Sequence, residues 1–343
     1  MEELITNHSN NSIVYLQPGE YYNGSQSCYS HPHLNYSIGI SISLVGVIAN
    51  LFFMYMVYQI PTMRTVLNAY LVNLAVSDLL FLLWHLSIWV KYLTSALTMS
   101  EYCAMMYFSR FCQYVSLFTV VVLSIERYLA MCKPIFYRDS VIHSRQFMSA
   151  TIVCIWLLSC ALSVEAVVDC MSTTDSRNTF GRVLFLLAVF SAMMLVLVMY
   201  ILIILAAKNS TRPVLTLKKE RQIIRICLAT ALVHFLCLTP VLIHTILLMT
   251  EIDPAGDDYD LSHYVMCLGN ISSFLLEINS AVNPFIYNIL SSTYRQACRR
   301  ALCCGQKSHR RGDGSGHYMS ARTLSTRSAS TALSPNSQDV CSM

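Results

Sequence analysis

The stretch CAMMYFSRFCQYVSLFTVVVLSIERYLAMCKP, residues 103–134, decides how the rest of the chain is interpreted. It has no glycine, its only proline is the last residue, and at about 1.5 Å per residue a helix of this length is longer than a bilayer is thick. Polar side chains recur every three residues along one face: Arg110, Gln113, Ser116 and Thr119. A long apolar helix with one polar stripe belongs inside a bundle, with the stripe facing partner helices.

The composition indicates a membrane protein. Of the 343 residues, 55% are hydrophobic and 12% are charged, whereas roughly a quarter of a soluble domain is charged. Charge-poor apolar segments recur along the whole chain, as in helical membrane proteins. The net charge of +4 comes with no nucleic-acid motif, so no nucleic-acid partner is expected. The 14 cysteines show no pair at the spacing of a zinc or redox motif.

Seven segments are apolar and long enough to cross a membrane. We predict spans at residues 36–60, 67–93, 101–132, 147–168, 181–207, 221–249 and 264–290. The loops between them are short, so neighbouring helices are expected to be antiparallel. Residues 292–302 are basic and amphipathic, which predicts a short helix on the membrane surface. The predicted fold is therefore an all-α seven-transmembrane helix bundle with a short amphipathic eighth helix.

The charges in the loops predict the orientation. One set of loops holds most of the basic residues: Arg64, Lys133, Arg138, Arg145, Lys208, Arg212, Lys218, Lys219, Arg221 and Arg225. The other set holds Lys91, Arg177 and Arg182. The positive-inside rule then predicts an extracellular amino terminus. The outer segments are acidic, which either favours the approach of a cationic ligand or is ordinary solvated loop charge.

Three regions follow from these patterns: a polar tail at 1–35, a membrane domain at 36–304 and a Gly/Ser/Thr-rich tail at 305–343 that is expected to be disordered. The first tail carries four sequons, which predicts glycosylation at Asn7, Asn10, Asn23 and Asn35. Cys303 and Cys304, beside the basic surface helix, are either palmitoylation sites or ordinary reduced cysteines. The last tail holds candidate phosphorylation sites, Ser320, Thr323, Ser325, Thr326, Ser328, Ser330, Thr331 and Ser334.

Short motifs occur in a fixed order on these spans. They are Gly46-Val47-Ile48-Ala49-Asn50, Leu74-Ala75-Val76-Ser77-Asp78-Leu79, Glu126-Arg127-Tyr128, Trp156, Cys237-Leu238-Thr239-Pro240 and Asn283-Pro284-Phe285-Ile286-Tyr287. Because it carries these motifs in this order, the chain resembles the rhodopsin-like G-protein-coupled receptors over residues 36–304. The resemblance implies a multi-pass plasma-membrane receptor, not an enzyme. It also implies an extracellular ligand and a heterotrimeric G protein, which is activated when the sixth helix moves outward.

The resemblance implies an ion site in the middle of the membrane. Asp78 is a carboxylate within a span, where an isolated charge costs at least a few kcal/mol and needs partners. The family places a sodium ion here in the inactive state, and the matching oxygen ligands are Ser116, Asn279, Ser280 and Asn283. The alternative is a protonated or water-bridged Asp78 without an ion. No other cofactor is expected.

The resemblance also assigns a switch at the cytoplasmic ends. Arg127 is expected to pair with Glu126 and, across to the sixth helix, with Glu220, forming a latch that breaks on activation. Pro240 and Pro284 kink their helices and provide pivots. The other residues that match switch positions are Tyr128, Tyr200 and Tyr287. Arg127, Pro134 and Ile135 match the positions that contact the G protein, although Ile135 also suits simple loop packing.

Cysteines and core residues complete the comparison with the family. Cys103 matches the cysteine that bridges to the second outer loop, where Cys170 is the only cysteine. The remaining outer cysteines, Cys28 and Cys267, either form a second bridge or stay as two unpaired thiols. Cys103 is one residue nearer Arg127 than the family spacing. The core departs from the family at three positions: Leu238 replaces the switch tryptophan, His234 replaces a phenylalanine and Ala192 replaces a proline. His234 is either a hydrogen-bonded core histidine or a pH-sensitive element.

The outer halves of the spans contain an unusual set of polar residues. The candidate ligand-binding residues are His85, Trp89, Arg110, Gln113, Glu165, His244 and Glu277. Glu277 stands where opsins carry the retinal-linking lysine, and Ser109 stands where aminergic receptors carry an aspartate, which argues against both of those ligand classes. Arg110 and Glu277 either pair with each other or bind opposite charges of a ligand.

A pocket with both signs of charge suits a peptide, and short stretches resemble neuropeptide receptors of the thyrotropin-releasing-hormone, neuromedin and FMRFamide type. The prediction is therefore a receptor for a short neuropeptide. Besides the G protein, the expected partners are membrane lipid and, through the phosphorylated tail, receptor kinase and arrestin. The alternatives are a receptor for a chemosensory or lipid ligand and, outside the class, a membrane transporter, although the chain shows none of the internal repeats of that class.

Overall fold

The computed structural model describes residues 32–94, 98–171, 179–208, 214–249 and 259–307; near the edges of these ranges some side chains, those of Glu220, Cys303 and Cys304 among them, are not described. The chain divides into one unit up to Leu302 and a second from Cys303 onward, of which only the last residues of a helix are described. The account below concerns the first unit.

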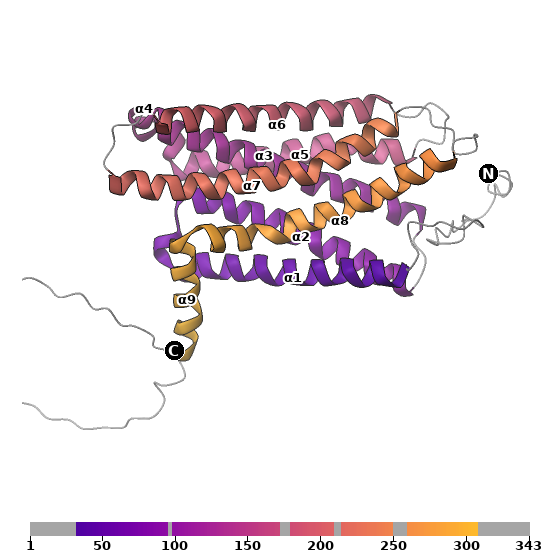
Figure 1. The fold of residues 1–343 in the computed structure, drawn as a ribbon, viewed down its shortest axis with the longest axis horizontal. Helices are drawn as coiled ribbons and strands as arrows, with labels where there is room; N and C mark the ends of the chain where they lie inside the picture. Colours follow the sequence, from indigo (N-terminus) through magenta and orange to yellow (C-terminus); the bar gives the residue numbers. More distant parts are fainter. Residues whose placement is uncertain (1–31, 95–97, 172–178, 209–213, 250–258, 308–343) are drawn as a thin grey trace, which may run out of the picture. The chain divides into compact units, whose positions relative to one another are not determined.

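Seven long helices lie side by side in this unit (Figure 1). They are α1 (Pro32–Gln59), α2 (Val66–Thr94), α3 (Met99–Cys132), α5 (Arg145–Met171), α6 (Thr179–Lys208), α7 (Val214–Leu247) and α8 (Tyr259–Leu290). The short elements in the described loops are η2 (Pro61–Met63), α4 (Pro134–Asp139) and η3 (Val141–His143). Helix α9 (Ser292–Lys307) turns away from the bundle directly after α8, as predicted for the surface helix.

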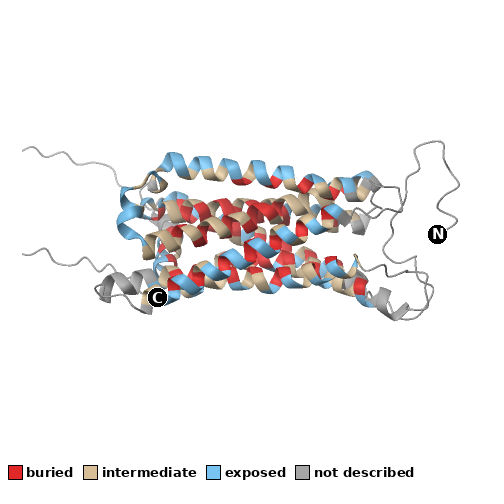
Figure 2. Ribbon diagram, turned by 90° about the horizontal axis from the view of Figure 1, so that it is seen from above, coloured by how far each residue is buried: buried red, intermediate tan, exposed pale blue. Residues whose placement is uncertain are grey.

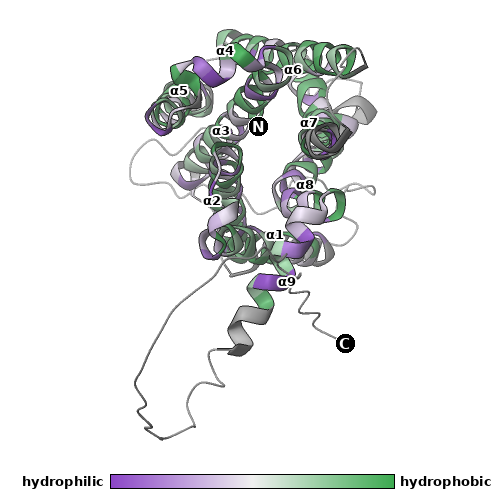
Figure 3. Cartoon of the chain, turned by 90° about the vertical axis from the view of Figure 1, so that its left-hand side faces the viewer, coloured by the Kyte–Doolittle hydropathy of each residue, from purple (hydrophilic) through white to green (hydrophobic). Residues whose placement is uncertain are grey.

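Six of the described helices, all but α8 among the long ones, are long and apolar enough to cross a membrane. Helix α8 is more polar because its inward face buries Glu277, Asn279 and Asn283. Buried residues gather where the helices face one another, while large apolar side chains such as Leu157 and Leu236 lie exposed on the outside (Figure 2). Seen end-on, the bundle is dominated by hydrophobic residues and α9 carries hydrophilic ones (Figure 3). An apolar outer surface is expected where lipid, not water, surrounds the helices.

Helix α3 occupies the centre of the bundle. It contacts α2, α4, α5, α6 and α7. Its start is fixed by a capping box, in which the Thr98 side chain accepts from the Glu101 amide and the Glu101 carboxylate accepts from the Thr98 amide. Its end lies just before Pro134, which opens α4 at a first-turn position that proline tolerates. The polar stripe is buried as predicted at Ser116 and Thr119.

The predicted span boundaries agree with the helices to within a few residues, except at two starts. Helix α7 begins at Val214, seven residues before the predicted 221, and α8 begins at Tyr259 instead of 264. The prediction stopped at charged residues such as Lys218 and Lys219, because charges do not belong in a hydrocarbon core. A helix needs no apolar surroundings outside the membrane, so α7 continues beyond its apolar segment.

Candidate functional site: an outer cavity, a polar core and a cytoplasmic latch

The end of the bundle near Cys103 contains a cavity of about 410 Å³ between α2, α3, α5, α6, α7 and α8. This volume lies within the range of small-ligand sites. Five of the seven predicted ligand-binding residues line it: His85, Arg110, Gln113, Glu165 and His244. Side chains from six helices therefore meet at one concave site.

Glu277 and Trp89, the other two predicted ligand-binding residues, are not among the residues that line the cavity. Glu277 is fully buried and accepts hydrogen bonds from Trp89 Nε1 at 2.7 Å and from Ser43 Oγ at 3.4 Å. His85 Nδ1 lies 3.1 Å from the same carboxylate, and His85 Nε2 lies 3.1 Å from Ser109 Oγ. Glu277 thus joins α8 to α1 and α2 behind the cavity wall, and His85 stands between it and the cavity.

Arg110 pairs with Glu165 on α5, where Nε lies 3.6 Å from Oε1. Its guanidinium also lies over the Phe185 ring of α6, 3.5 Å from the ring centroid. The sequence left a pairing of Arg110 with Glu277 open; the structure places these two charges with different partners. Among the described residues, the cavity wall therefore carries one acidic side chain, Glu165, and two guanidiniums, those of Arg110 and Arg182.

A disulfide connects α3 to α5 at the mouth of the cavity. Cys103 and Cys170 are bonded with a Cα–Cα distance of 5.5 Å, the pairing that the resemblance implied. Cys267 is also disulfide-bonded, and its partner is not among the described residues. Cys28 lies outside those residues, so the pairing of Cys28 with Cys267 stays a prediction.

Sequence reasoning missed several cavity residues. On α3 these are Tyr102, Met105, Met106 and Ser109, which continue the stripe of Arg110 and Gln113 at helical spacing. That spacing was a usable indication, because residues one turn apart share a face. Arg182 was interpreted as an outer loop charge, but it lies in α6, lines the cavity and donates from Nη1 to the Leu248 carbonyl at 2.9 Å.

Below the cavity lies the polar core around Asp78. Asp78 is 1% exposed and accepts a hydrogen bond from Asn283 Nδ2 at 2.8 Å. Ser116, Asn279 and Ser280 are also buried. The Oδ1 atoms of Asn279 and Asn283 are buried acceptors without a donor among the described residues. A carboxylate surrounded by acceptor oxygens fits a hard monovalent cation such as sodium, for which these residues would supply the ligands.

His234 and Leu238 lie between the cavity and this core. Both are buried, and His234 Nε2 lies 3.4 Å from Ser116 Oγ, joining α7 to α3. They line a small cavity of about 10 Å³, room for about one water molecule. Gln113 and Leu276 line both this small cavity and the outer one. The two sites therefore share walls.

At the other end of α3, Glu126 is 4% exposed and accepts from Arg127 Nε at 2.6 Å and from the Tyr137 hydroxyl of α4. Tyr137 was not predicted; its burial and its bond to Glu126 raise the pKa of its hydroxyl, so it stays a neutral donor. Glu220 belongs to α7, but its side chain lies outside the described residues, so the Arg127–Glu220 latch stays a prediction.

The remaining switch residues lie on facing helices. Tyr200 and Tyr287 are buried, Tyr128 packs against the cluster around Tyr200, and Pro240 and Pro284 lie inside α7 and α8. Pro134 begins α4. Ile135 is 71% exposed, so simple packing within the loop does not bury its side chain.

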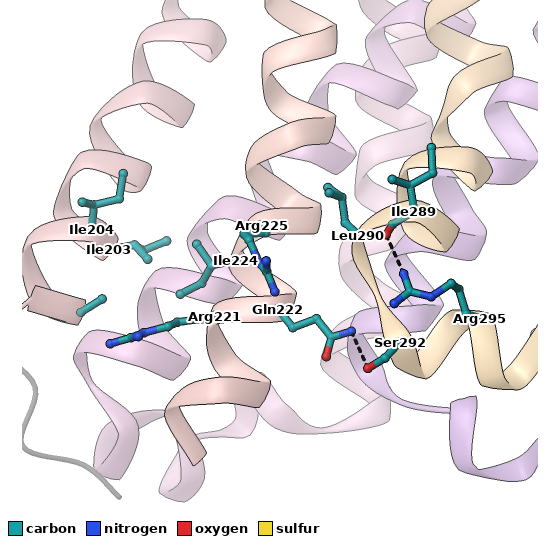
Figure 4. A pocket seen from close by; sticks show the side chains of 11 residues that line it. Ile203, Ile204, Arg221, Gln222, Ile224, Arg225, Ile289, Leu290, Ser292 and Arg295 are labelled. Atoms are coloured by element: carbon teal, nitrogen blue, oxygen red, sulfur yellow. Dashed lines mark hydrogen bonds between the residues drawn. The ribbon is translucent and has the colours of Figure 1, made fainter. Parts of the chain in front are cut away.

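A second cavity, of about 840 Å³, lies at the opposite end of the bundle, called the cytoplasmic end after the predicted orientation, between α6, α7, α8 and α9 (Figure 4). Arg221, Arg225 and Arg295 line it together with apolar side chains such as Ile203 and Leu290. No acidic residue is among the described residues that form its wall. This surface suits an amphipathic partner with acidic or carboxylate groups.

The family model of the 7 transmembrane receptors of the rhodopsin family matches residues 49–287. The chain belongs to this family. It is therefore a multi-pass membrane receptor and not an enzyme, and the all-α seven-transmembrane prediction is confirmed. Membership also implies an extracellular ligand and signalling through G proteins. Residues 49–287 include five of the motifs in full, from Leu74 to Tyr287, and the last two residues of the first, Ala49 and Asn50.

Several predicted modification sites lie outside the described residues or remain untested. Asn7, Asn10 and Asn23 precede the described part of the chain, and Asn35 lies in the first turn of α1. The side chains of Cys303 and Cys304 and the serines and threonines of the last tail are not described. Glycosylation, palmitoylation and phosphorylation stay predictions.

Proposed function

We propose that the receptor binds a short peptide, of neuropeptide type, in the outer cavity from the extracellular side. The observation that carries this proposal is the cavity wall, which combines an acidic side chain, two guanidiniums and several hydroxyl and imidazole groups. A peptide offers carbonyls, amides and terminal charges to such a wall. A lipid or a volatile odorant offers few hydrogen-bonding groups to this wall, and each wall donor or acceptor that loses its water without gaining a ligand bond costs about 1–3 kcal/mol.

The position of Gln113 supports a route from ligand to helix movement. A ligand that contacts Gln113 touches the wall that the outer cavity shares with the small cavity beside Ser116 and His234. His234 belongs to α7, so a shift of this wall acts on the helix that carries Pro240. In the proposed mechanism α7 then swings outward about Pro240. A sodium ion, when bound, would be held by Asp78, Ser116, Asn279, Ser280 and Asn283 and would stabilise the inactive arrangement.

A heterotrimeric G protein then enters the widened cytoplasmic cavity beside Arg127, with Pro134 and Ile135 at its edge. The basic, partly apolar wall of that cavity supports this placement. The amino terminus is extracellular in this arrangement, and the receptor resides in the plasma membrane. Receptor kinase and arrestin act on the phosphorylated tail, and lipid contacts α9.

The test is a screen of short peptides, both amidated and free acids, on cells that express the receptor, with calcium and cyclic AMP as readouts. We expect at least one peptide to signal in receptor-expressing cells only and to lose potency in Arg110→Gln. Response to volatiles or lipids, with no response to any peptide, would contradict the peptide assignment. Substrate flux in proteoliposomes without G protein would contradict the receptor mechanism altogether.

A further inference from the structure

We propose that Gln222 is a positioning residue that latches the cytoplasmic end of α7 to the junction of α8 and α9. The Nε2 atom of Gln222 donates to Ser291 Oγ at 2.8 Å. It also donates to Ser292 Oγ at 3.2 Å, the bond drawn in Figure 4. Gln222 belongs to α7, Ser291 lies between α8 and α9, and Ser292 opens α9. The side-chain amide therefore ties three helices together.

Ser291 is a fixed anchor for this bond. It is 2% exposed, and its Oγ also accepts from the Tyr294 amide at 3.3 Å, as a capping serine does at a helix start. A serine oxygen has two lone pairs, and both are then used, one for the helix cap and one for Gln222. The Tyr294 ring is held in turn by Tyr287 and Phe53. Gln222 thus bonds to Ser291, a residue that its own contacts hold in place when α7 moves.

The latch lies at the edge of an open space. Gln222 is itself part of the wall of the 840 Å³ cytoplasmic cavity, and further along α7 the side chains of Ile224 and Cys227 pack in one cluster with Ile203 of α6. Glu126 accepts hydrogen bonds from Arg127 of the same helix and from Tyr137 of α4, and these bonds hold α3 and α4 and not α7. In the proposed mechanism the outward swing of α7 must break the Gln222 bonds, so they favour the closed state.

The signalling consequence of the latch rests on the proposed G-protein mechanism, whereas the hydrogen bonds of Gln222 do not depend on it. The first measurement is therefore structural. Spin labels at Arg221→Cys on α7 and Arg299→Cys on α9, in a background without the other accessible cysteines, report the distance between these ends by pulsed electron resonance. We expect Gln222→Leu to shift the distribution towards longer distances. An unchanged distribution would refute the latch, whatever the receptor couples to.

The second measurement is basal G-protein activation in cells at matched surface expression. We expect Gln222→Leu to raise basal activation roughly threefold to tenfold, because the variant loses one or two hydrogen bonds near the protein surface. Ser291→Ala should raise it as well and should add little to Gln222→Leu, because both remove the same bond. Gln296→Leu changes an exposed glutamine of α9 and should not alter it.

The outcomes separate the latch from the proposed function. Basal activity unchanged in Gln222→Leu but raised in Glu126→Gln refutes the latch and leaves the receptor mechanism standing. A lengthened distance with no G-protein response in any variant supports the latch and contradicts the proposed coupling. An equal rise in Gln296→Leu would show that a general change at α9, and not the Gln222 bond, is responsible.

Discussion

The two ends of the bundle are held together by different forces. At the outer end, charged groups on different helices bond to one another: Glu277 of α8 bonds to α1 and α2, Arg110 of α3 pairs with α5, and a disulfide adds to this. At the cytoplasmic end, the charged pair formed by described residues, Glu126–Arg127, lies within α3. Rings and apolar side chains there make most of the contacts between helices. The outer end is thus cross-linked, and the cytoplasmic end is free to rearrange.

Helix α7 shows this difference along its own length. Its outer end receives the Arg182 hydrogen bond at Leu248, and its His244 lies against Gly269 of α8. Its cytoplasmic end borders the 840 Å³ cavity. Pro240 lies between, where the helix lacks one backbone donor. A helix fixed at one end and weakly held at the other pivots, which is the motion that a ligand-driven receptor requires.

The strongest way to break the cross-linked end is Glu277→Leu. It leaves Ser43, His85 and Trp89 without their buried acceptor, and we expect a loss of about 3–5 kcal/mol in folding stability. The measurement is thermal unfolding of the purified receptor together with surface expression. Glu277→Gln keeps an acceptor and should cost less than half as much. Equal melting temperatures for Glu277→Leu and the lipid-facing control Ile278→Leu would contradict the assignment.

Arg110→Gln tests whether the outer charges serve the ligand. It removes a cavity guanidinium and leaves Glu165 without that partner, and we expect agonist potency to fall by roughly 30-fold, about 2 kcal/mol. Dose–response curves for the peptide identified by screening measure this. Arg110→Lys keeps the charge without the planar fork and should lose less. Unchanged potency in Arg110→Gln would place the ligand elsewhere.

Glu126→Gln tests the weaker restraint at the cytoplasmic end. The acceptor loses its charge, which weakens the bonds from Arg127 and Tyr137, and we expect basal G-protein activation to rise about tenfold, about 1.4 kcal/mol. Tyr137→Phe removes one donor and should give a smaller rise. Because the pKa of Tyr137 is raised, its bond is fully present below its unfolded-state pKa of about 10 and should not change across physiological pH. Unchanged basal activation in Glu126→Gln would show that the Glu126–Arg127 pair does not restrain the receptor.

Gly269→Ala is the mildest test. Its Cβ would lie 2.8 Å from His244 Nε2, the end of a movable side chain, so His244 should yield towards the cavity. We expect stability to change by less than about 1 kcal/mol and agonist potency to fall no more than about fivefold. By contrast, Gly46→Ala meets the Ala281 backbone at 3.0 Å and should destabilise the fold more, with no selective loss of potency. Equal effects of the two variants on potency would contradict the placement of His244 in the ligand site.

The sequence was sufficient for the helices because apolar length and loop charge are local properties. The stripe on α3 likewise predicted its central place. The sequence did not predict which charges pair, since Arg110 and Glu277 are brought to their partners by packing among helices far apart in the chain. Tyr137 and Gln222 were missed for the same reason: each is unremarkable in its own segment, and its role depends on a partner that only the fold places beside it.

The most direct test of the account compares the two ends of α7 in one receptor. Spin-label pairs at Cys132 and Arg221→Cys report the cytoplasmic end, and pairs at Val183→Cys and Leu248→Cys report the outer end. On addition of agonist and nucleotide-free G protein, the account predicts that the cytoplasmic distance lengthens by on the order of 5 Å while the outer distance stays the same. An unchanged cytoplasmic distance, or equal lengthening at both ends, would contradict it.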